Sequence, residues 1–208
     1  EQRGQQQILL LTALLKLRQI CCDPGLLGAP DIGSAKREHC IEMIEELVEE
    51  KRAILVFSQF TSMLERLAHD LDERNINYLK LTGKSRNRQQ LVESFQDGAA
   101  PVFLISLKAG GVGLNLTRAD TVIHFDPWWN LAAEQQASDR VHRIGQLKPV
   151  FIYKLIATNT IEEKIATLQQ QKANFSNHIN HQAQISGNQF SMKLEDLMSL
   201  WQVETKNA

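Results

Sequence analysis

The chain alternates between short apolar runs and longer stretches in which apolar residues recur every three or four positions. A short run of this kind is typical of a parallel strand buried on both faces, and the longer period is typical of a helix with one buried side. Five runs predict strands, at residues 53–57, 78–81, 102–105, 121–125 and 150–156. Four lead to a helical pattern, and the third leads to a glycine-rich loop. This alternation predicts an α/β fold with a doubly wound, mostly parallel sheet.

Two helices are expected before the first strand. The first ends at Asp23-Pro24-Gly25, and its apolar residues recur at helical spacing: Ile8, Leu11, Leu14, Leu15, Leu17 and Ile20. The second begins near Ser34, where we expect only a partial cap because Arg37 stands where a capping box has Glu. We expect its buried side to hold Ile41, Ile44, Leu47 and Val48.

The composition shifts after about residue 172 to Asn, Gln, Ser and His, without a strong apolar period. A last short helix is predicted near the end, with one apolar side made of Leu194, Leu197, Met198, Leu200 and Trp201. We therefore divide the chain into a helical lead-in (1–33), an α/β lobe (34–172) and a polar segment with a C-terminal helix (173–208).

The composition is that of a folded globular domain, with 43% hydrophobic and 23% charged residues among 208. The formal net charge is -1, so a nucleic-acid partner would have to be met by a local basic patch. The longest apolar stretch, residues 8–15, is too short to cross a membrane, and we expect no membrane partner. Cys21, Cys22 and Cys40 form no C-x-x-C pair, which favours buried thiols and an intracellular location.

Polar residues cluster directly after the first four predicted strands. These segments are Ser58-Gln59, residues 82–85, residues 106–115 and residues 126–130. In open α/β sheets, ligands bind beyond the carboxyl ends of the strands. We therefore expect the functional site at that edge.

The glycine-rich segment 109–115 has several possible roles. A dinucleotide fingerprint is excluded because Leu116 stands at the third glycine position, and a Walker loop at 28–33 is excluded because Ser34-Ala35 follows and no strand precedes it. One remaining hypothesis is a loop whose backbone N–H groups approach a sugar-phosphate backbone, helped by the side chains of Ser106, Lys108 and Asn115. The other is a tight turn whose glycines serve only positive φ angles.

Arg140 and Arg143 lie three residues apart in a helix predicted from Asn130 to about Arg143. This spacing puts both guanidinium groups on one side of the helix, where they could grip a transferring phosphate as arginine fingers. The alternative is a surface pair that compensates Asp139 and Glu134.

Five motifs occur in order along the lobe. They are V-F-S-Q-F at 56–60, L-T-G at 81–83, S-L-K-A-G-G-V-G-L-N-L at 106–116, F-D-P-W-W-N at 125–130 and D-R-V-H-R-I-G-Q at 139–146. Together they resemble the second RecA-like lobe of Swi/Snf-family superfamily-two ATPases, over about residues 8–168, and the tail is similar to bacterial-type members. The segment 14–26 is similar to the stretch that enters this lobe. Leu131 replaces the usual proline, and Lys84-Ser85 replaces the usual Ser-Thr pair.

The resemblance implies a DNA-stimulated ATPase that translocates on duplex DNA and remodels protein–DNA complexes. Its cofactor would be ATP with Mg²⁺, held mainly by a first RecA-like lobe that these residues do not include. Asp72-Glu73 lies in a predicted helix and is no substitute for the metal-binding acids of that lobe. The implied partners are double-stranded DNA, the first lobe and a DNA-bound protein as remodelling target. The implied location is the cytoplasm or nucleoid in a bacterium, or the nucleus in a eukaryote.

Site residues follow from the motifs that match. The resemblance makes Arg140 and Arg143 catalytic arginine fingers and turns Gly113, Asp139 and Gln146 towards ATP. The residues it assigns to the DNA backbone are Ser58, Gln59, Gly83, Ser85, Ser106, Lys108, Ala109, Gly110 and Asn115.

The sequence also allows a function without catalysis. The chain could be a non-catalytic DNA-binding or regulatory module that retains the fold, although a pure binding module has no use for phosphate-directed arginines.

His178-x-x-His181 has metal-like spacing but no companion ligands nearby, so no metal site is expected. Of Trp128 and Trp129, one is expected in the core.

Overall fold

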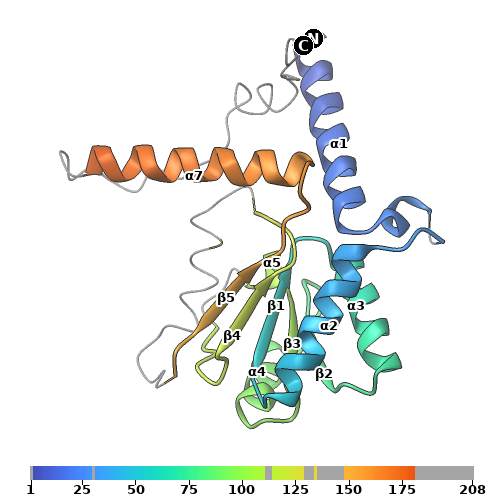
Figure 1. Ribbon diagram of the computed structural model, residues 1–208, viewed down its shortest axis with the longest axis vertical. Helices are drawn as coiled ribbons and strands as arrows, with labels where there is room; N and C mark the ends of the chain where they lie inside the picture. Colours follow the sequence, from blue (N-terminus) through green and yellow to red (C-terminus); the bar gives the residue numbers. More distant parts are fainter. Residues whose placement is uncertain (1, 30, 111–113, 129–133, 135–147, 181–208) are drawn as a thin grey trace.

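Five parallel strands form one sheet in the order β2-β3-β1-β4-β5 (Figure 1). They are β1 (Ile54–Ser58), β2 (Tyr78–Leu81), β3 (Val102–Ser106), β4 (Thr121–His124) and β5 (Phe151–Lys154). The computed structural model describes residues 2–29, 31–110, 114–128, 134 and 148–180. The parallel α/β fold expected from the sequence is confirmed, and each strand starts and ends within two residues of its predicted limits.

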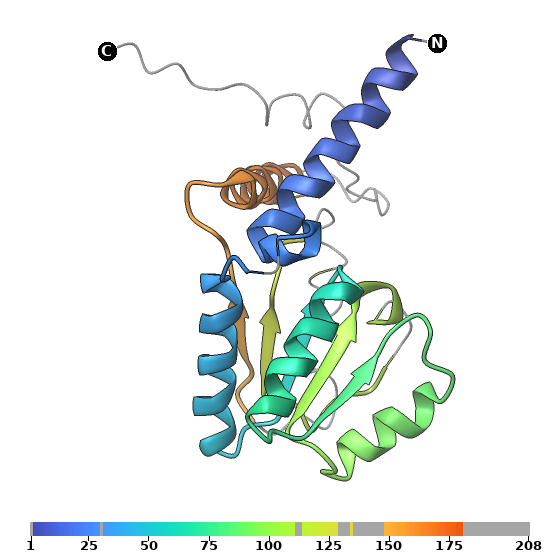
Figure 2. The same ribbon diagram turned by 90° about the vertical axis from the view of Figure 1, so that its right-hand side faces the viewer.

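Helices lie on both faces of the sheet (Figures 1 and 2). Their bounds are α1 (Gln2–Cys22), the 3-10 turn η1 (Pro24–Leu27), α2 (Ala35–Glu49), α3 (Thr61–Glu73), α4 (Arg88–Gln96), the one-turn α5 (Leu107–Gly110) and α7 (Ile161–Asn180). Ser34 caps α2 as expected, because its Oγ accepts a hydrogen bond from the Arg37 N–H at 3.2 Å. The backbone of α7 continues past residue 172, into the segment predicted to be polar.

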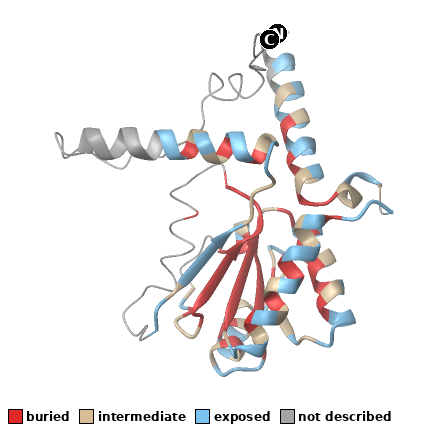
Figure 3. Cartoon of the chain, viewed as in Figure 1, coloured by how far each residue is buried: buried red, intermediate tan, exposed pale blue. Residues whose placement is uncertain are grey.

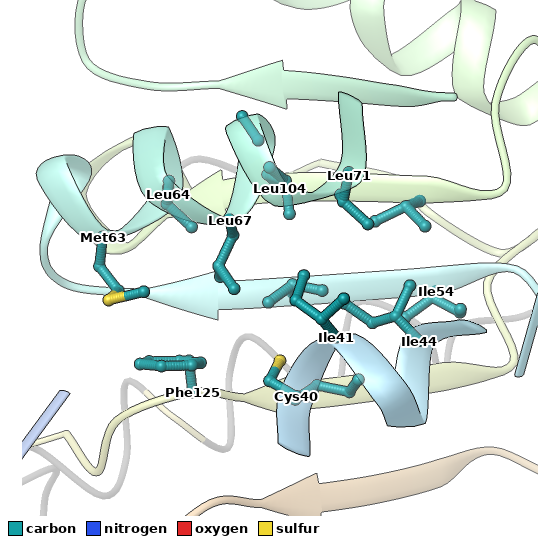
Figure 4. Close-up of a cluster of buried hydrophobic side chains, with 14 of the residues drawn as sticks. Cys40, Ile41, Ile44, Ile54, Met63, Leu64, Leu67, Leu71, Leu104 and Phe125 are labelled. Atoms are coloured by element: carbon teal, nitrogen blue, oxygen red, sulfur yellow. The ribbon is translucent and has the colours of Figure 1, made fainter. Parts of the chain in front are cut away.

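Alternate residues of β1 serve two separate cores because successive side chains of a strand point to opposite faces. Ile54 and Val56 pack with α2 and α3, in the cluster shown in Figure 4. Leu55 and Phe57 pack with α4, α5 and Trp128 on the other face. The central strands are therefore buried on both sides, as their continuous apolar runs predicted.

Strand β5 differs from that expectation. All four of its residues are exposed, including Phe151 at 44% and Ile152 at 42% (Figure 3). The predicted strand exists beside β4, at one edge of the sheet, but its predicted burial on both faces is wrong.

The apolar side predicted for the first helix is also wrong. Of its six members only Leu14 is fully buried, whereas Ile8 is 67% exposed. The buried stripe of α1 consists of Leu14, Arg18 and Cys22, each four residues from the next. The reason is that α1 packs on α7 and on the carboxyl edge of the sheet, and does not lie flat on a sheet face (Figures 1 and 3).

The cysteines mostly match their prediction. Cys22 and Cys40 are fully buried, while Cys21 is half-buried and so departs from the expected core position. Burial raises the pKa of Cys40 to about 12, which keeps that thiol protonated at neutral pH. Within the described residues, no helix has the length and apolarity needed to span a bilayer.

Candidate functional site

The carboxyl ends of β1, β3 and β4 meet at one edge of the sheet. Ser58 is the register partner of Ser106, and Phe57 is the partner of His124. Polar segments that are distant in sequence are thus neighbours at this edge, as the sequence predicted. We call it the carboxyl edge.

Ser58 and Gln59, two predicted DNA contacts, are tied into the turn after β4. The buried Ser58 hydroxyl donates to Asp126 Oδ1 at 2.5 Å and accepts from the Phe60 N–H at 3.1 Å. The Gln59 side-chain amide donates to Asp126 Oδ2 and to the Pro127 carbonyl. In this structure both side chains are therefore occupied within the protein, and Ser58 is shielded from solvent.

Arg18 completes this network, although sequence reasoning assigned it no role. Its side chain is 1% exposed and ion-pairs with Asp126, with Nη2 and Oδ2 at 3.8 Å. Burial lowers the pKa of Arg18, and the charge of Asp126 opposes that shift. Burial likewise raises the pKa of Asp126, against the hydrogen bond from Ser58 and the charge of Arg18. The burial of Arg18 could have been predicted from its place in the helix, because it lies four residues from both Leu14 and Cys22 on the same side.

The end of β3 presents a buried hydroxyl beside an exposed ammonium. Ser106 is 2% exposed, and among the described residues its Oγ has no hydrogen-bond partner. Lys108 is exposed, and Asn115 is exposed beyond the segment 111–113. A buried polar group without a partner is costly, so it points to a ligand or to ordered water.

Ala109 and Gly110 are buried, and each has a structural task. The Ala109 carbonyl accepts a hydrogen bond from the Arg88 guanidinium. A Cβ at Gly110 would lie 3.3 Å from Phe57 Cε1, so the glycine allows α5 to approach β1 closely. Gly110 is not among the residues with positive φ, so close packing, and not an unusual backbone angle, accounts for a glycine there.

The turn after β2 is closed by its own hydrogen bonds. The Ser85 hydroxyl accepts from the Thr82 N–H at 3.0 Å, and the Ser85 N–H donates to the Thr82 carbonyl at 3.1 Å. Gly83 and Lys84 stay exposed at its tip, and Arg86 is exposed directly after it. Because the bond from Arg88 to Ala109 joins the start of α4 to α5, these basic residues and Lys108 belong to neighbouring segments. The local basic patch that a nucleic-acid partner would need stays a prediction, for which Lys84, Arg86 and Lys108 are exposed candidates.

The residues predicted to face ATP cannot be placed. Gly113, Asp139, Arg140, Arg143 and Gln146 all lie outside the described residues. Trp128 is 3% exposed and is a core residue, while Trp129 also lies outside them.

Within the described residues, the one group with potential metal ligands is His69, Asp70 and Glu73 on α3. Asp70 is already paired with Arg37 at 3.1 Å, and the other two side chains are exposed. The side chain of His178 and all of His181 are outside the described part of the chain.

His124 at the end of β4 makes stability depend on pH. Burial lowers its pKa from 6.5 to about 4, so the unfolded chain binds a proton more readily than the folded one between these values. The stabilisation is complete above pH 6.5 and is lost as the pH falls towards 4. We expect this residue alone to account for roughly 2 to 3 kcal/mol of that loss. Urea unfolding of wild type and His124→Gln across this range measures it, and parallel profiles would contradict the assignment.

Comparisons with known proteins agree with the fold and the motifs. A family model described as the helicase conserved C-terminal domain matches residues 35–145. An uncharacterized ATP-dependent helicase of Mycoplasma pneumoniae is 45% identical over 166 residues, which cover 78% of this chain and 16% of that protein. A Bacillus subtilis protein that carries the name ATP-dependent helicase/translocase YwqA is 36% identical over 205 residues, or 94% of this chain and 22% of that protein.

Among solved structures, the Sulfolobus solfataricus SWI2/SNF2 ATPase core in complex with dsDNA superposes with a TM-score of 0.67. It is 36% identical, and the match covers 82% of this chain and 37% of that one. The chain spans 13% to 24% of the length of the curated relatives it matches. It belongs to the helicase conserved C-terminal domain family and is the C-terminal, RecA-like lobe of a Swi2/Snf2-type helicase.

Proposed function

We propose that the chain is the second motor lobe of a DNA-stimulated ATPase that translocates on duplex DNA and remodels protein–DNA complexes. The observation that carries the proposal is the end of β3, where the Ser106 hydroxyl has no hydrogen-bond partner among the described residues and lies two residues before the exposed Lys108. A phosphate oxygen would satisfy both groups, since it accepts hydrogen bonds and carries negative charge. Double-stranded DNA in the Sulfolobus complex supports this choice of ligand.

We propose that the turns after β2 and β3 contact the sugar-phosphate backbone of DNA. Gly83 and Ser85 would approach the phosphates after β2, and Ser106, Lys108 and Asn115 would do so after β3. Ala109 and Gly110 would contribute through backbone groups, because neither offers a polar side chain. Ser58 and Gln59 would shape the carboxyl edge without contacting DNA phosphates directly, since their side chains already bind Asp126.

The described residues do not suffice to hold ATP with Mg²⁺. Asp126 is a buried acid at the ends of β1 and β4, and it is committed to Ser58, Gln59 and Arg18. The nucleotide and its metal would therefore be held mainly by a first lobe, and ATP hydrolysis would supply the driving force for translocation. Arg140 and Arg143 would stabilise charge on the transferring phosphate, with Gly113, Asp139 and Gln146 beside them.

We expect the isolated 208-residue chain to lack ATP hydrolysis, because no Walker lysine and no metal-binding acid pair lies in its sequence. The longer protein that also carries the first lobe should hydrolyse ATP, and duplex DNA should stimulate it. A phosphate-release assay on both proteins, with and without duplex DNA, measures this. Turnover by the isolated chain would contradict the division of labour, and a two-lobe protein without stimulated turnover would favour a non-catalytic DNA-binding module.

A further inference from the structure

Helix α1 is anchored to the lobe through its C-terminal half. Leu14 packs with Ile165 of α7, and Arg18 reaches the carboxyl edge one turn further on. The end of the helix is held separately by the buried Asp23, which accepts from Arg37 Nη1 at 2.6 Å and from Arg66 Nε at 2.8 Å. The attachment of α1 therefore does not depend on Arg18 alone.

The Arg18 guanidinium joins two turns that follow different strands. Its Nη1 donates to Gln59 Oε1 at 2.8 Å, in the turn after β1. Its Nη2 donates to the Pro127 carbonyl at 2.5 Å, in the turn after β4. Gln59 in turn donates to Asp126 and Pro127, so the three side chains and one carbonyl form a closed brace between the turns. We call it the Arg18 brace.

A lysine could not build this brace. The planar fork of arginine presents several N–H donors at fixed angles, so two nitrogens can serve two acceptors at once. A lysine ammonium also has three donors, but all of them leave one nitrogen on a flexible stem, so it would not hold Gln59 Oε1 and the Pro127 carbonyl at the fixed separation set by two arginine nitrogens. The chemistry of the side chain, and not only its charge, is used here.

The braced turns support the proposed DNA-binding segment. Ser58, at the base of the first turn, is the strand partner of Ser106. Phe57, one residue earlier, packs against Gly110 in the helical turn that carries Lys108. Movement of the turn after β1 would therefore displace Ser106 and Lys108 relative to a bound phosphate.

We propose that Arg18 is a positioning residue for DNA binding: through the Arg18 brace it holds the turns after β1 and β4 in the arrangement that presents Ser106 and Lys108 to the DNA backbone. It touches neither DNA nor ATP itself. The inference rests on the proposed function for the DNA step, while the holding of the two turns is a property of the protein alone.

The test compares Arg18→Lys with Arg66→Lys in the protein that carries both lobes. Both variants keep a positive charge beside a buried aspartate, but Arg66 pairs with Asp23 and touches neither turn of the brace. In Arg18→Lys, the DNA concentration that gives half-maximal ATPase stimulation should rise about tenfold, while kcat at saturating DNA and KM for ATP change less than about twofold. Arg66→Lys should leave all three values near those of wild type.

Hydrogen–deuterium exchange, measured well below the melting temperature, reports on the turns without using activity. Peptides that cover residues 58–60 and 125–128 should exchange faster in Arg18→Lys and at the wild-type rate in Arg66→Lys. Unchanged exchange in both turns, or equal losses of kcat and DNA affinity, would overturn the proposal. A wild-type protein without DNA-stimulated hydrolysis would overturn the proposed function instead, and the exchange data would still decide whether Arg18 holds the turns.

Discussion

Replacing Arg140 or Arg143 by alanine in the two-lobe protein is expected to lower ATP turnover about a thousandfold and to leave DNA affinity nearly unchanged. The reason is that arginine fingers stabilise charge that develops on the transferring phosphate, and that charge is absent while DNA simply binds. Lysine at either position should restore little, because it lacks the planar fork. ATPase rate measured against DNA concentration separates the two effects.

Lys108→Ala is the matched comparison, because it removes one positive charge from the same lobe. It should raise the DNA concentration needed for stimulation and change turnover at saturating DNA much less, since a phosphate contact contributes to binding alone. Equal losses of DNA affinity in Arg140→Ala and Lys108→Ala would show that the arginine pair binds DNA and not ATP.

Phe57→Ala is expected to lower the free energy of unfolding by about 3 to 5 kcal/mol, the usual cost of emptying a buried aromatic site. Phe57 is fully buried on β1 and stacks on His124, with ring centroids 5.6 Å apart. The Trp128 ring meets it edge-on at 6.0 Å, and Gly110 packs closely against its ring. The cavity would thus lie next to His124, Trp128 and Gly110, directly beneath the carboxyl edge. Urea unfolding monitored by circular dichroism gives the value.

Phe151→Ala controls for the loss of an aromatic ring from a strand. Phe151 lies on β5 and is 44% exposed, with the Arg52 guanidinium 4.5 Å from its ring centroid. Its replacement should cost about 1 kcal/mol, because nearly half of its surface stays exposed and it forms no part of a buried core cluster. Similar losses for the two variants would mean that β5 is covered in solution.

The sequence predicted the strands well because a buried parallel strand leaves a signal that is local. Four residues of continuous apolar character, at 54–57 and at 102–105, are enough to mark β1 and β3, whatever their neighbours are. The burial of β5 could not be predicted in the same way, since its residues resemble those of a central strand. Only the strand order places it at an edge, and strand order depends on contacts between distant segments.

The candidate site, like the fold, was predictable where the signal is local and not where it depends on contacts between distant segments. Polar residues after each strand predicted the carboxyl edge, because parallel strands bring their carboxyl ends together. The bonds of Asp126 to Ser58 and Gln59 depend on the register of β1 against β4, which no local pattern encodes. Arg18 was missed because a charged residue in an amphipathic helix is usually solvent-exposed, and its burial requires a partner 108 residues away in the chain.

Acidic side chains of α2 and lysines of the carboxyl edge lie at opposite ends of the strands. Helix α2 leads into β1, so Glu45, Glu46 and Glu49 near its C-terminal end lie towards the amino ends of the strands. Lys84 and Lys108 are exposed at the opposite, carboxyl edge. A polyanion would be repelled by these glutamates and attracted by these lysines, and the resulting torque would turn the lobe during approach before any contact forms. At physiological ionic strength the torque acts only within about 8 Å. It would therefore affect the orientation in which the lobe meets the polyanion, and not the distance from which the polyanion is attracted.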